Sequence, residues 1–113
     1  VLFRSSAGAI EHVPMALVSG LPTAIQQMRD KGIWVVGLDD SSDNTLFEIG
    51  KLANEGICLV LGSEGAGLSR LVRDRCDTIV GIPMLGQVSS LNVSAAAALA
   101  TYEVTRVRMA ERA

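Results

Sequence analysis

Residues 56–68 read Gly-Ile-Cys-Leu-Val-Leu-Gly-Ser-Glu-Gly-Ala-Gly-Leu, an apolar run that leads into a loop with three glycines. The apolar run, residues 56–61, has the length and composition of a buried β-strand. The glycine loop, residues 62–67, precedes a short helix that we expect over residues 69–75. Because open α/β sheets bind ligands where strands pass into loops at their carboxyl ends, this stretch predicts a fold class and the position of a site.

Strand and helix patterns alternate outward from this stretch. Apolar runs predict further strands at residues 15–18, 33–38 and 78–84. Helical patterns predict helices from Leu21 to just before Gly32, over residues 45–53, and from Ser90 to the end of the chain. The alternation predicts one domain, residues 1–113, of the α/β class, with a mostly parallel sheet flanked by helices.

Composition and charge restrict the kind of protein and partner. The chain has 113 residues, of which 49% are hydrophobic and 19% charged, a globular composition without an apolar run long enough for a membrane span. Residues 1–64 carry a net charge of −4 and residues 65–113 a net charge of +2. An anionic partner such as RNA should therefore meet the second half, where Arg70, Arg73 and Arg75 follow the glycine loop.

The cysteines and the single histidine exclude several kinds of site. Cys58 and Cys76 form no CxxC pair and are distant in sequence from His12, so no metal site is expected. They are typical of reduced thiols in a cytoplasmic protein, and Cys58 of a core residue. No Gly-x-Ser-x-Gly motif accompanies His12, which argues against a hydrolase.

The glycine loop nearly matches two nucleotide-binding motifs. The spacing of Gly62 and Gly67 copies the P-loop, but Leu68 stands where a lysine must reach the phosphates. Gly65 and Gly67 copy the start of the dinucleotide fingerprint, but Arg70 replaces its third glycine. Neither ATP nor a dinucleotide is therefore the expected ligand, and a purely structural glycine turn is the alternative.

A second polar cluster, residues 86–94, precedes the expected C-terminal helix and reads Gly-Gln-Val-Ser-Ser-Leu-Asn-Val-Ser. Ser89 or Ser90 has a simple explanation as the N-cap of that helix. Asn92 has none, because asparagine is a mediocre helix former inside a first turn. This cluster alone leaves a helix cap and a functional site equally open.

Together the two clusters resemble a known family. The second and third motifs of the SpoU (TrmH) RNA 2′-O-ribose methyltransferases are similar, in sequence and in joint spacing, to residues 59–68, 82–84 and 89–94. The RlmB branch of that family, which modifies a guanosine of 23S ribosomal RNA, is similar to residues 6–9, 12–14 and 33–37. The resemblance covers about residues 5–109, nearly the whole chain.

The resemblance implies S-adenosylmethionine as the cofactor. By motif position, the residues that hold it are Gly62, Ile82 and Leu91, largely through backbone groups, and a strand-end carbonyl near Leu38 lines the same pocket. At Gly62 the missing Cβ would let the backbone approach the ligand. Ile82 and Leu91 would present main-chain groups and apolar surface to the adenosine.

The implied reaction transfers the cofactor's methyl group to a ribose 2′-oxygen. A neutral hydroxyl is a poor nucleophile, so it needs a base or a nearby charge that favours its deprotonated form. The resemblance assigns Asn92 and Ser90 to positioning the ribose or an activating arginine, and Glu64 to ordering the loop or that arginine. A solvent-facing loop carboxylate is the alternative for Glu64.

Two consequences of the resemblance concern the chain as a whole. The implied fold is of the SPOUT type, with a trefoil knot in which residues 82–94 pass under residues 62–68, an exception to the rule that chains do not thread loops. The family's first motif, Asn-x-Gly-x-x-x-Arg, is absent. We therefore expect the C-terminal portion of a methyltransferase domain, without the family's N-terminal RNA-binding domain and inactive by itself.

The expected partners are RNA and a second copy of the chain. SPOUT proteins are usually homodimers with the C-terminal helix in the interface, and the face formed by Leu91, Ala95, Ala98 and Tyr102 suits such packing. Packing of that face in the core of one subunit is the alternative. Alternative functions are a tRNA 2′-O-ribose methyltransferase of the same family, or a non-catalytic nucleotide-binding or dimerisation module.

Overall fold

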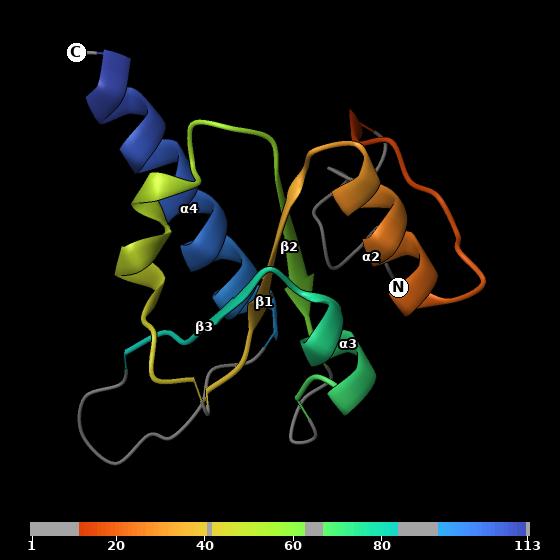
Figure 1. Cartoon of the computed structure of the whole chain (residues 1–113). Helices are drawn as coiled ribbons and strands as arrows, with labels where there is room; N and C mark the ends of the chain where they lie inside the picture. The colour runs from red at the N-terminus through yellow and green to blue at the C-terminus, as the bar shows by residue number, and fades with distance from the viewer. Residues whose placement is uncertain (1–11, 41, 63–66, 84–92, 113) are drawn as a thin grey trace.

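A computed structural model describes residues 12–40, 42–62, 67–83 and 93–112. In chain order the elements are α2 (Leu21–Asp30), β1 (Trp34–Leu38), the 3-10 helix η2 (Leu46–Lys51), β2 (Ile57–Leu61), α3 (Arg70–Arg75), β3 (Thr78–Val80) and α4 (Val93–Arg112). The predicted alternation of strands and helices is confirmed from Leu21 onward over these residues (Figure 1).

The three strands form one parallel sheet in the order β2-β1-β3. β1 pairs with β2 along its whole length, from Trp34 beside Ile57 to Leu38 beside Leu61. On its other side, β1 pairs with β3 from Val36 to Leu38. Since all three strands run the same way, their carboxyl ends meet at one edge of the sheet, where the glycine loop leaves β2.

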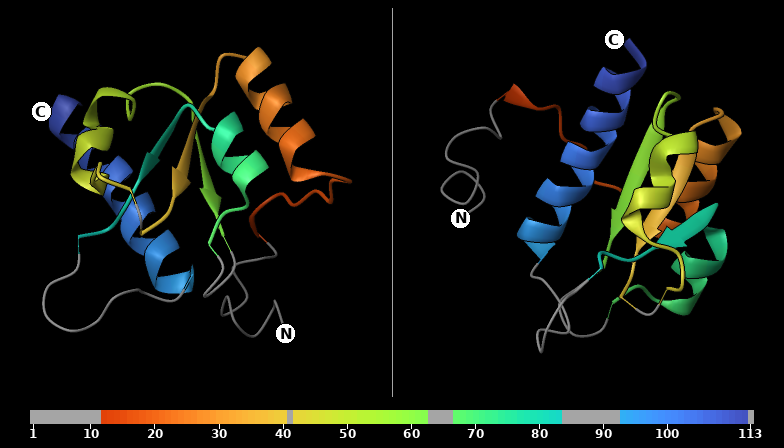
Figure 2. Two further views of the ribbon diagram at one scale, coloured as in Figure 1. Left: turned by 60° about the horizontal axis from the view of Figure 1, so that its bottom comes forward. Right: turned by 90° about the vertical axis from the view of Figure 1, so that its left-hand side faces the viewer.

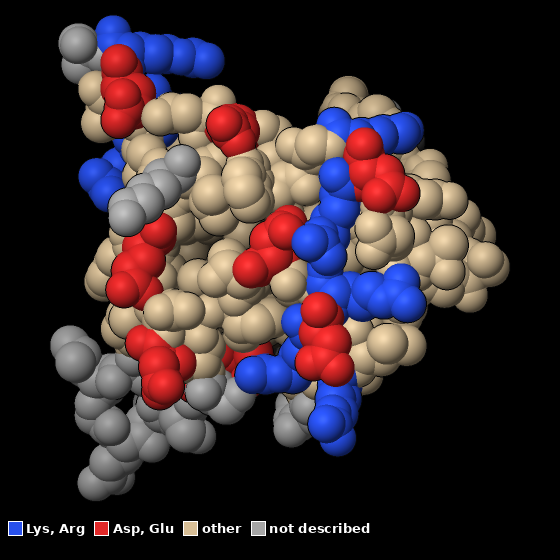
Figure 3. Space-filling model, in the orientation of Figure 1, with Lys and Arg blue, Asp and Glu red and all other residues tan. Residues whose placement is uncertain are grey.

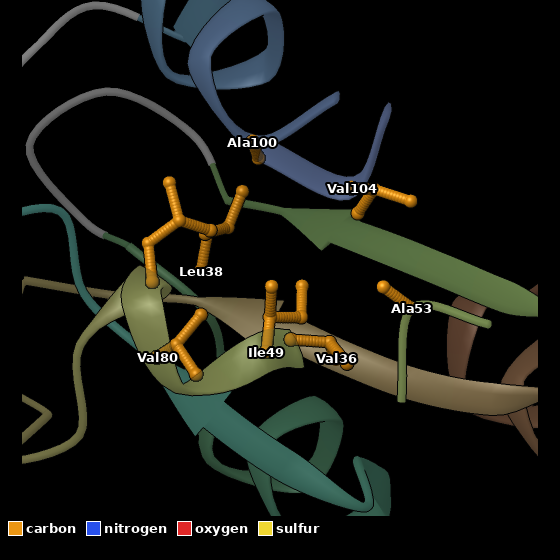
Figure 4. Close-up of a cluster of buried hydrophobic side chains, with 8 residues drawn as sticks. Val36, Leu38, Ile49, Ala53, Val80, Ala100 and Val104 are labelled. Atoms are coloured by element: carbon orange, nitrogen blue, oxygen red, sulfur yellow. The ribbon is translucent and has the colours of Figure 1, made fainter. Parts of the chain in front are cut away.

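Helices cover both faces of the sheet (Figure 1, Figure 2), and the sheet divides the core into two clusters. The cluster under α4 and η2, drawn in Figure 4, consists of Val36, Leu38, Leu46, Ile49, Ala53, Val80, Ala100 and Val104. The cluster under α2 and α3 consists of Ile25, Val35, Val60, Leu68 and Val72. Because successive side chains of a strand point to opposite faces, β1 contributes to both clusters. It is also the middle strand of the sheet.

Local sequence accounts for several helix boundaries. Thr45 and Glu48 form a capping box at the start of η2: the side chain of each residue accepts a hydrogen bond from the backbone N–H of the other. Ser69 caps α3 by accepting a hydrogen bond from the backbone N–H of Val72 (3.3 Å). Past the end of α2, Gly32 has a φ of +79°, in the left-handed region that glycine tolerates.

Two predicted strands differ from the structure. Residues 15–18 form no strand, and their large side chains are exposed. An extended run becomes a strand only when a neighbour takes its backbone hydrogen bonds, and no described strand pairs with this run. The second difference is the strand predicted over residues 78–84, because β3 already ends at Val80. The reason is that the N–H of Gly81 donates to the carbonyl of Asn44 (2.8 Å) and its carbonyl accepts from the N–H of Leu46 (2.8 Å).

The C-terminal helix α4 packs on the sheet through the side that carries Ala100 and Val104. The face singled out in the sequence lies on the other side, where Ala98 and Tyr102 are exposed and Ala95 is half-buried. Core packing within one subunit is therefore wrong for Ala98 and Tyr102, and their exposure leaves this side of α4 accessible.

The predicted knot falls largely outside the described residues. Residues 63–66 and 84–92 are not described, so the passage of residues 82–94 under residues 62–68 stays a prediction. Among the helices that the structure describes, none is long and apolar enough to cross a membrane.

Candidate functional site

The carboxyl edge of the sheet brings together the residues that follow the three strands: Asp39 after β1, Gly62 after β2 and Gly81 after β3. The backbone N–H of Asp39 donates to the carbonyl of Val80 (3.0 Å), which joins the ends of β1 and β3. A Cβ on Gly81 would lie 3.1 Å from the carbonyl oxygen of Asp39. This edge is therefore built of closely spaced backbone, with Asp39 on the central strand.

The two ends of the glycine loop contact each other. A Cβ on Gly62 would overlap with the carbonyl group of Gly67 and would lie 2.7 Å from the backbone nitrogen of Leu68. No side chain fits in that space, so position 62 requires glycine. From the sequence we expected glycine at position 62 because a ligand needs room to approach. In the structure the reason is different, because the backbone of Gly67 and Leu68 fills that space.

Gly67 lies close to Gly62 and to the charged pair of Asp39 and Arg73. Its φ is +68°, in the left-handed region that favours glycine. A Cβ on it would lie 3.1 Å from Oδ2 of Asp39. The same oxygen lies 2.6 Å from Nη1 of Arg73, which belongs to α3. The Asp39 carboxylate thus lies close to the end of the glycine loop and is paired with the helix that follows it.

Leu68, the residue at the P-loop lysine position, faces the core. It is buried, and a Cβ on Gly37 of β1 would lie 2.8 Å from its Cδ1. A lysine at position 68 would bury its charge instead of reaching a phosphate. Gly37 was missed in the sequence; a lone glycine inside an apolar strand, typical of a close approach, is the signal that could have found it.

The structure describes only part of the predicted site. Gly62 lies at the carboxyl edge, after β2, and Ile82 lies there too, after β3. The half-buried Ile82 side chain packs on the cluster under α4. Four further predicted residues lie outside the described part of the chain: Glu64, Ser90, Leu91 and Asn92.

Basic side chains gather over α2 and α3, interleaved with acidic ones (Figure 3). Three of them were predicted to meet an anionic partner. Arg73 is paired with Asp39, and Arg75 donates from Nη1 to the carbonyl of Pro22 (3.5 Å), which joins α3 to α2. Arg70, at the start of α3, is exposed. Of the three, Arg70 is the one best placed to contact a partner.

The cysteines have the properties of structural thiols. Both are free, and both pack against the cluster under α2 and α3. Burial raises the pKa of the Cys58 thiol, and burial together with neighbouring Cys58 and Asp77 raises the pKa of Cys76. A raised pKa leaves less thiolate, the reactive form. Among the described residues, no group of His, Cys, Asp and Glu is arranged to hold a metal ion.

A cavity of about 310 Å³ lies at the opposite, amino edge of the sheet and is lined by Gln26, Arg29, Asp30, Gly32, Ile33, Trp34 and Asp77. Within it, Nε of Arg29 lies 3.1 Å from Oδ1 of Asp77, so these two charges neutralise each other. The second oxygen of Asp77 accepts a hydrogen bond from the backbone N–H of Val35 (2.7 Å). The predicted site residues that the structure describes lie at the other edge.

This fold and this edge define a class of protein: an α/β protein with the parallel sheet and flanking helices of the SPOUT methyltransferases. The profile of the SpoU rRNA Methylase family matches residues 1–102, so the chain belongs to that family. A Bacillus subtilis protein, YacO, assigned by name to the TrmH family of tRNA/rRNA methyltransferases, is 46% identical over 105 residues. The match covers 93% of this chain and 41% of YacO.

Three further similar proteins are also longer than this chain. A Staphylococcus aureus protein with the same family name is 46% identical over 107 residues, 93% of this chain and 42% of its own length. The crystal structure of the SpoU methyltransferase AviRb from Streptomyces viridochromogenes, in complex with AdoMet, has a TM-score of 0.83 at 33% identity and covers 95% of this chain. An RNA 2′-O ribose methyltransferase has a TM-score of 0.85 at 27% identity. The chain spans 44% and 41% of these two structures.

Proposed function

We propose that this protein is an S-adenosylmethionine-dependent RNA 2′-O-ribose methyltransferase of the cytoplasm that acts on a guanosine of 23S ribosomal RNA. The observation that carries the proposal is the family match over residues 1–102, which includes the glycine loop at the carboxyl edge of the sheet. The complex of AviRb with AdoMet supports the choice of cofactor. The likeness of residues 6–9, 12–14 and 33–37 to the RlmB branch supports the choice of RNA.

The carboxyl edge suits an adenosine with a sulfonium better than a nucleoside triphosphate. Leu68 is buried at the position where a P-loop carries its lysine, and Arg73 beside Gly67 is already paired with Asp39. Triphosphate charge would therefore be poorly compensated. Gly62, Ile82 and Leu91 are the proposed cofactor contacts. The cofactor, when bound, supplies an electrophilic methyl group.

Transfer also requires groups that act on the ribose. We assign Asn92 and Ser90 to positioning the ribose and Glu64 to ordering the glycine loop. The family's activating arginine belongs to an Asn-x-Gly-x-x-x-Arg motif that this sequence does not contain. General acid–base assistance accounts for about 10²–10⁴-fold of a rate. We therefore expect the 113-residue chain by itself to show no measurable methyl transfer.

A binding experiment tests the cofactor separately from the reaction. Calorimetric titration of the chain with S-adenosylmethionine should show binding, and titration with ATP and Mg²⁺ should not. Binding of ATP with no response to S-adenosylmethionine would contradict the proposal. It would favour a nucleotide-binding module instead.

A transfer experiment tests the substrate. A longer form of the protein that contains an Asn-x-Gly-x-x-x-Arg motif should move labelled methyl groups onto 23S rRNA fragments, while the 113-residue chain should not. Equal turnover by the two forms would mean that the activating group lies within the present sequence. Transfer to tRNA instead would favour the second candidate function, which the names of the Bacillus and Staphylococcus relatives also allow.

RNA and a second copy of the chain are the proposed partners. Each phosphate that an arginine neutralises steepens the fall of log affinity with log salt by about one unit. Arg70→Gln in the longer form should reduce that slope by about one unit, because Arg70 is exposed beside the glycine loop. The exposed side of α4 is the proposed dimer surface, and it carries Ala98, Leu99, Tyr102 and Met109.

A further inference from the structure

Asp39 occupies a junction at the carboxyl edge of the sheet, where three segments meet. Its backbone N–H donates to Val80 of β3, and its carbonyl oxygen accepts from the N–H of Ser42 (3.2 Å). Its carboxylate pairs with Arg73 and lies close to Gly67, and its side chain is only 14% exposed. The side chain of one residue at the end of β1 thus reaches both the loop that follows β2 and the helix α3.

The ion pair joins the residue after β1 to the helix α3. Arg73 belongs to the helix that starts three residues after Gly67, and its Nη1 lies 2.6 Å from Oδ2 of Asp39. The position that a Cβ on Gly67 would take lies 3.1 Å from the same oxygen. A glycine with a φ of +68° has many other conformations available, so its position depends on its surroundings. The Asp39 carboxylate, paired with Arg73, is part of those surroundings.

We propose that Asp39 and Arg73 are positioning residues: their ion pair holds Gly67 against Gly62 and so sets the distance between the two ends of the glycine loop for the cofactor. The inference rests on the proposed function, because it names the device that shapes the same site. It also gives Arg73 a role other than contact with RNA. Neither residue is proposed to touch the reacting atoms.

The molecule contains a matched control pair. Arg29 and Asp77 lie 3.1 Å apart, with side-chain exposures of 39% and 16%, against 34% and 14% for Arg73 and Asp39. Both aspartates also stand next to a strand, Asp77 before β3 and Asp39 after β1. The two pairs differ in place, at the amino and the carboxyl edge of the same sheet. A general effect of losing an ion pair should therefore appear equally in both.

The first readout is local and needs no cofactor. Amide hydrogen exchange at Gly67, Leu68 and Ser69 is measured by NMR in the wild-type chain and in Asp39→Asn, Arg73→Gln, Asp77→Asn and Arg29→Gln. Loss of a charge-assisted contact should speed exchange at these three amides about tenfold in the Asp39 and Arg73 variants. The Asp77 and Arg29 variants should leave them unchanged. Arg73→Lys, which keeps the charge, should restore much of the protection.

The second readout is the Kd for S-adenosylmethionine, which should rise about tenfold in Asp39→Asn and Arg73→Gln and stay unchanged in the control pair. Unchanged exchange at the three amides, or equal acceleration in both pairs, would overturn the inference. Unchanged affinity with faster exchange would also overturn it, because the loop would then not be preset for the cofactor. If the wild-type chain shows no binding, the proposed function fails, and the exchange result still decides whether the pair holds Gly67.

Discussion

The backbone of Gly67 occupies the space in which a Cβ of Gly62 would stand, so that its carbonyl group would overlap with that Cβ. The obstacle is backbone, which moves less readily than the end of a side chain. The residue that follows β2 and the residue that closes the glycine loop are thus fitted to each other. This contact places Gly67 at the carboxyl edge of the sheet.

We expect Gly62→Ala to lower the free energy of unfolding by about 1–3 kcal/mol, because the extra methyl group must displace backbone. Gly56→Ala, at the other end of β2, is the matched control. Its Cβ would meet Cγ1 of Ile33 at 3.6 Å, an ordinary contact. We expect that variant to be neutral or stabilised by up to about 1 kcal/mol. Urea unfolding measures both, and equal effects would contradict the fitted contact of Gly62 and Gly67.

Cys58 and Cys76 should react slowly with thiol reagents at pH 8 in the folded chain. Burial raises the pKa of both thiols, so the thiolate fraction at this pH is smaller than in the unfolded chain. We expect reaction with Ellman's reagent to be about tenfold slower without urea than in denaturing urea. Equally fast reaction in both conditions would show that the thiols are open to solvent.

The pair of Glu103 and Arg106 on α4 should contribute stability that depends on pH. Hydrogen bonds from Arg106, at 2.8 and 2.9 Å, hold the pKa of the Glu103 carboxyl below its ordinary value. A carboxyl with a lowered folded-state pKa stabilises fully above its unfolded-state pKa, and this stabilisation is lost as the pH falls through the folded-state value.

Glu103→Gln should therefore lower the free energy of unfolding by about 0.5 kcal/mol at pH 7, a small effect because Arg106 is largely exposed. The difference from wild type should shrink as the pH falls below about 4. Glu111→Gln, on the same helix, is the control and should change little. A difference that stays constant from pH 7 to pH 3 would argue against the ion pair as its source.

Substitutions on the exposed side of α4 should weaken the proposed homodimer. Tyr102 and Met109 are 72% and 66% exposed, and the core side of the helix is occupied by other residues. A glutamate at either position would place a charge in an apolar contact, and the dimer Kd should rise at least about tenfold. Thr101→Glu, a quarter turn away on the same helix, should have a smaller effect. Sedimentation velocity over a range of concentrations measures all three variants, and an unchanged dimer in Tyr102→Glu would reject this surface.

The strands were predictable where local pattern and final environment agree. The apolar runs at residues 33–38 and 56–61 became β1 and β2 because each lies within a sheet covered by helices on both faces. The run at residues 15–18 has the same local character and forms no strand. Periodicity describes what a segment favours, but a strand also needs a partner for its backbone, which a neighbour elsewhere in the chain must supply.

By itself the sequence determined the class of fold, the family and the place of the glycine loop, because these depend on residue types and spacings along the chain. Only the tertiary structure showed why position 62 requires glycine, that Gly37 makes room for Leu68, and that Arg73 forms an ion pair with Asp39. Each of these facts joins residues that are neighbours through the sheet or through chain reversal. Contacts of that kind depend on how strands stack and loops return, and the order of residues along a single chain does not display them.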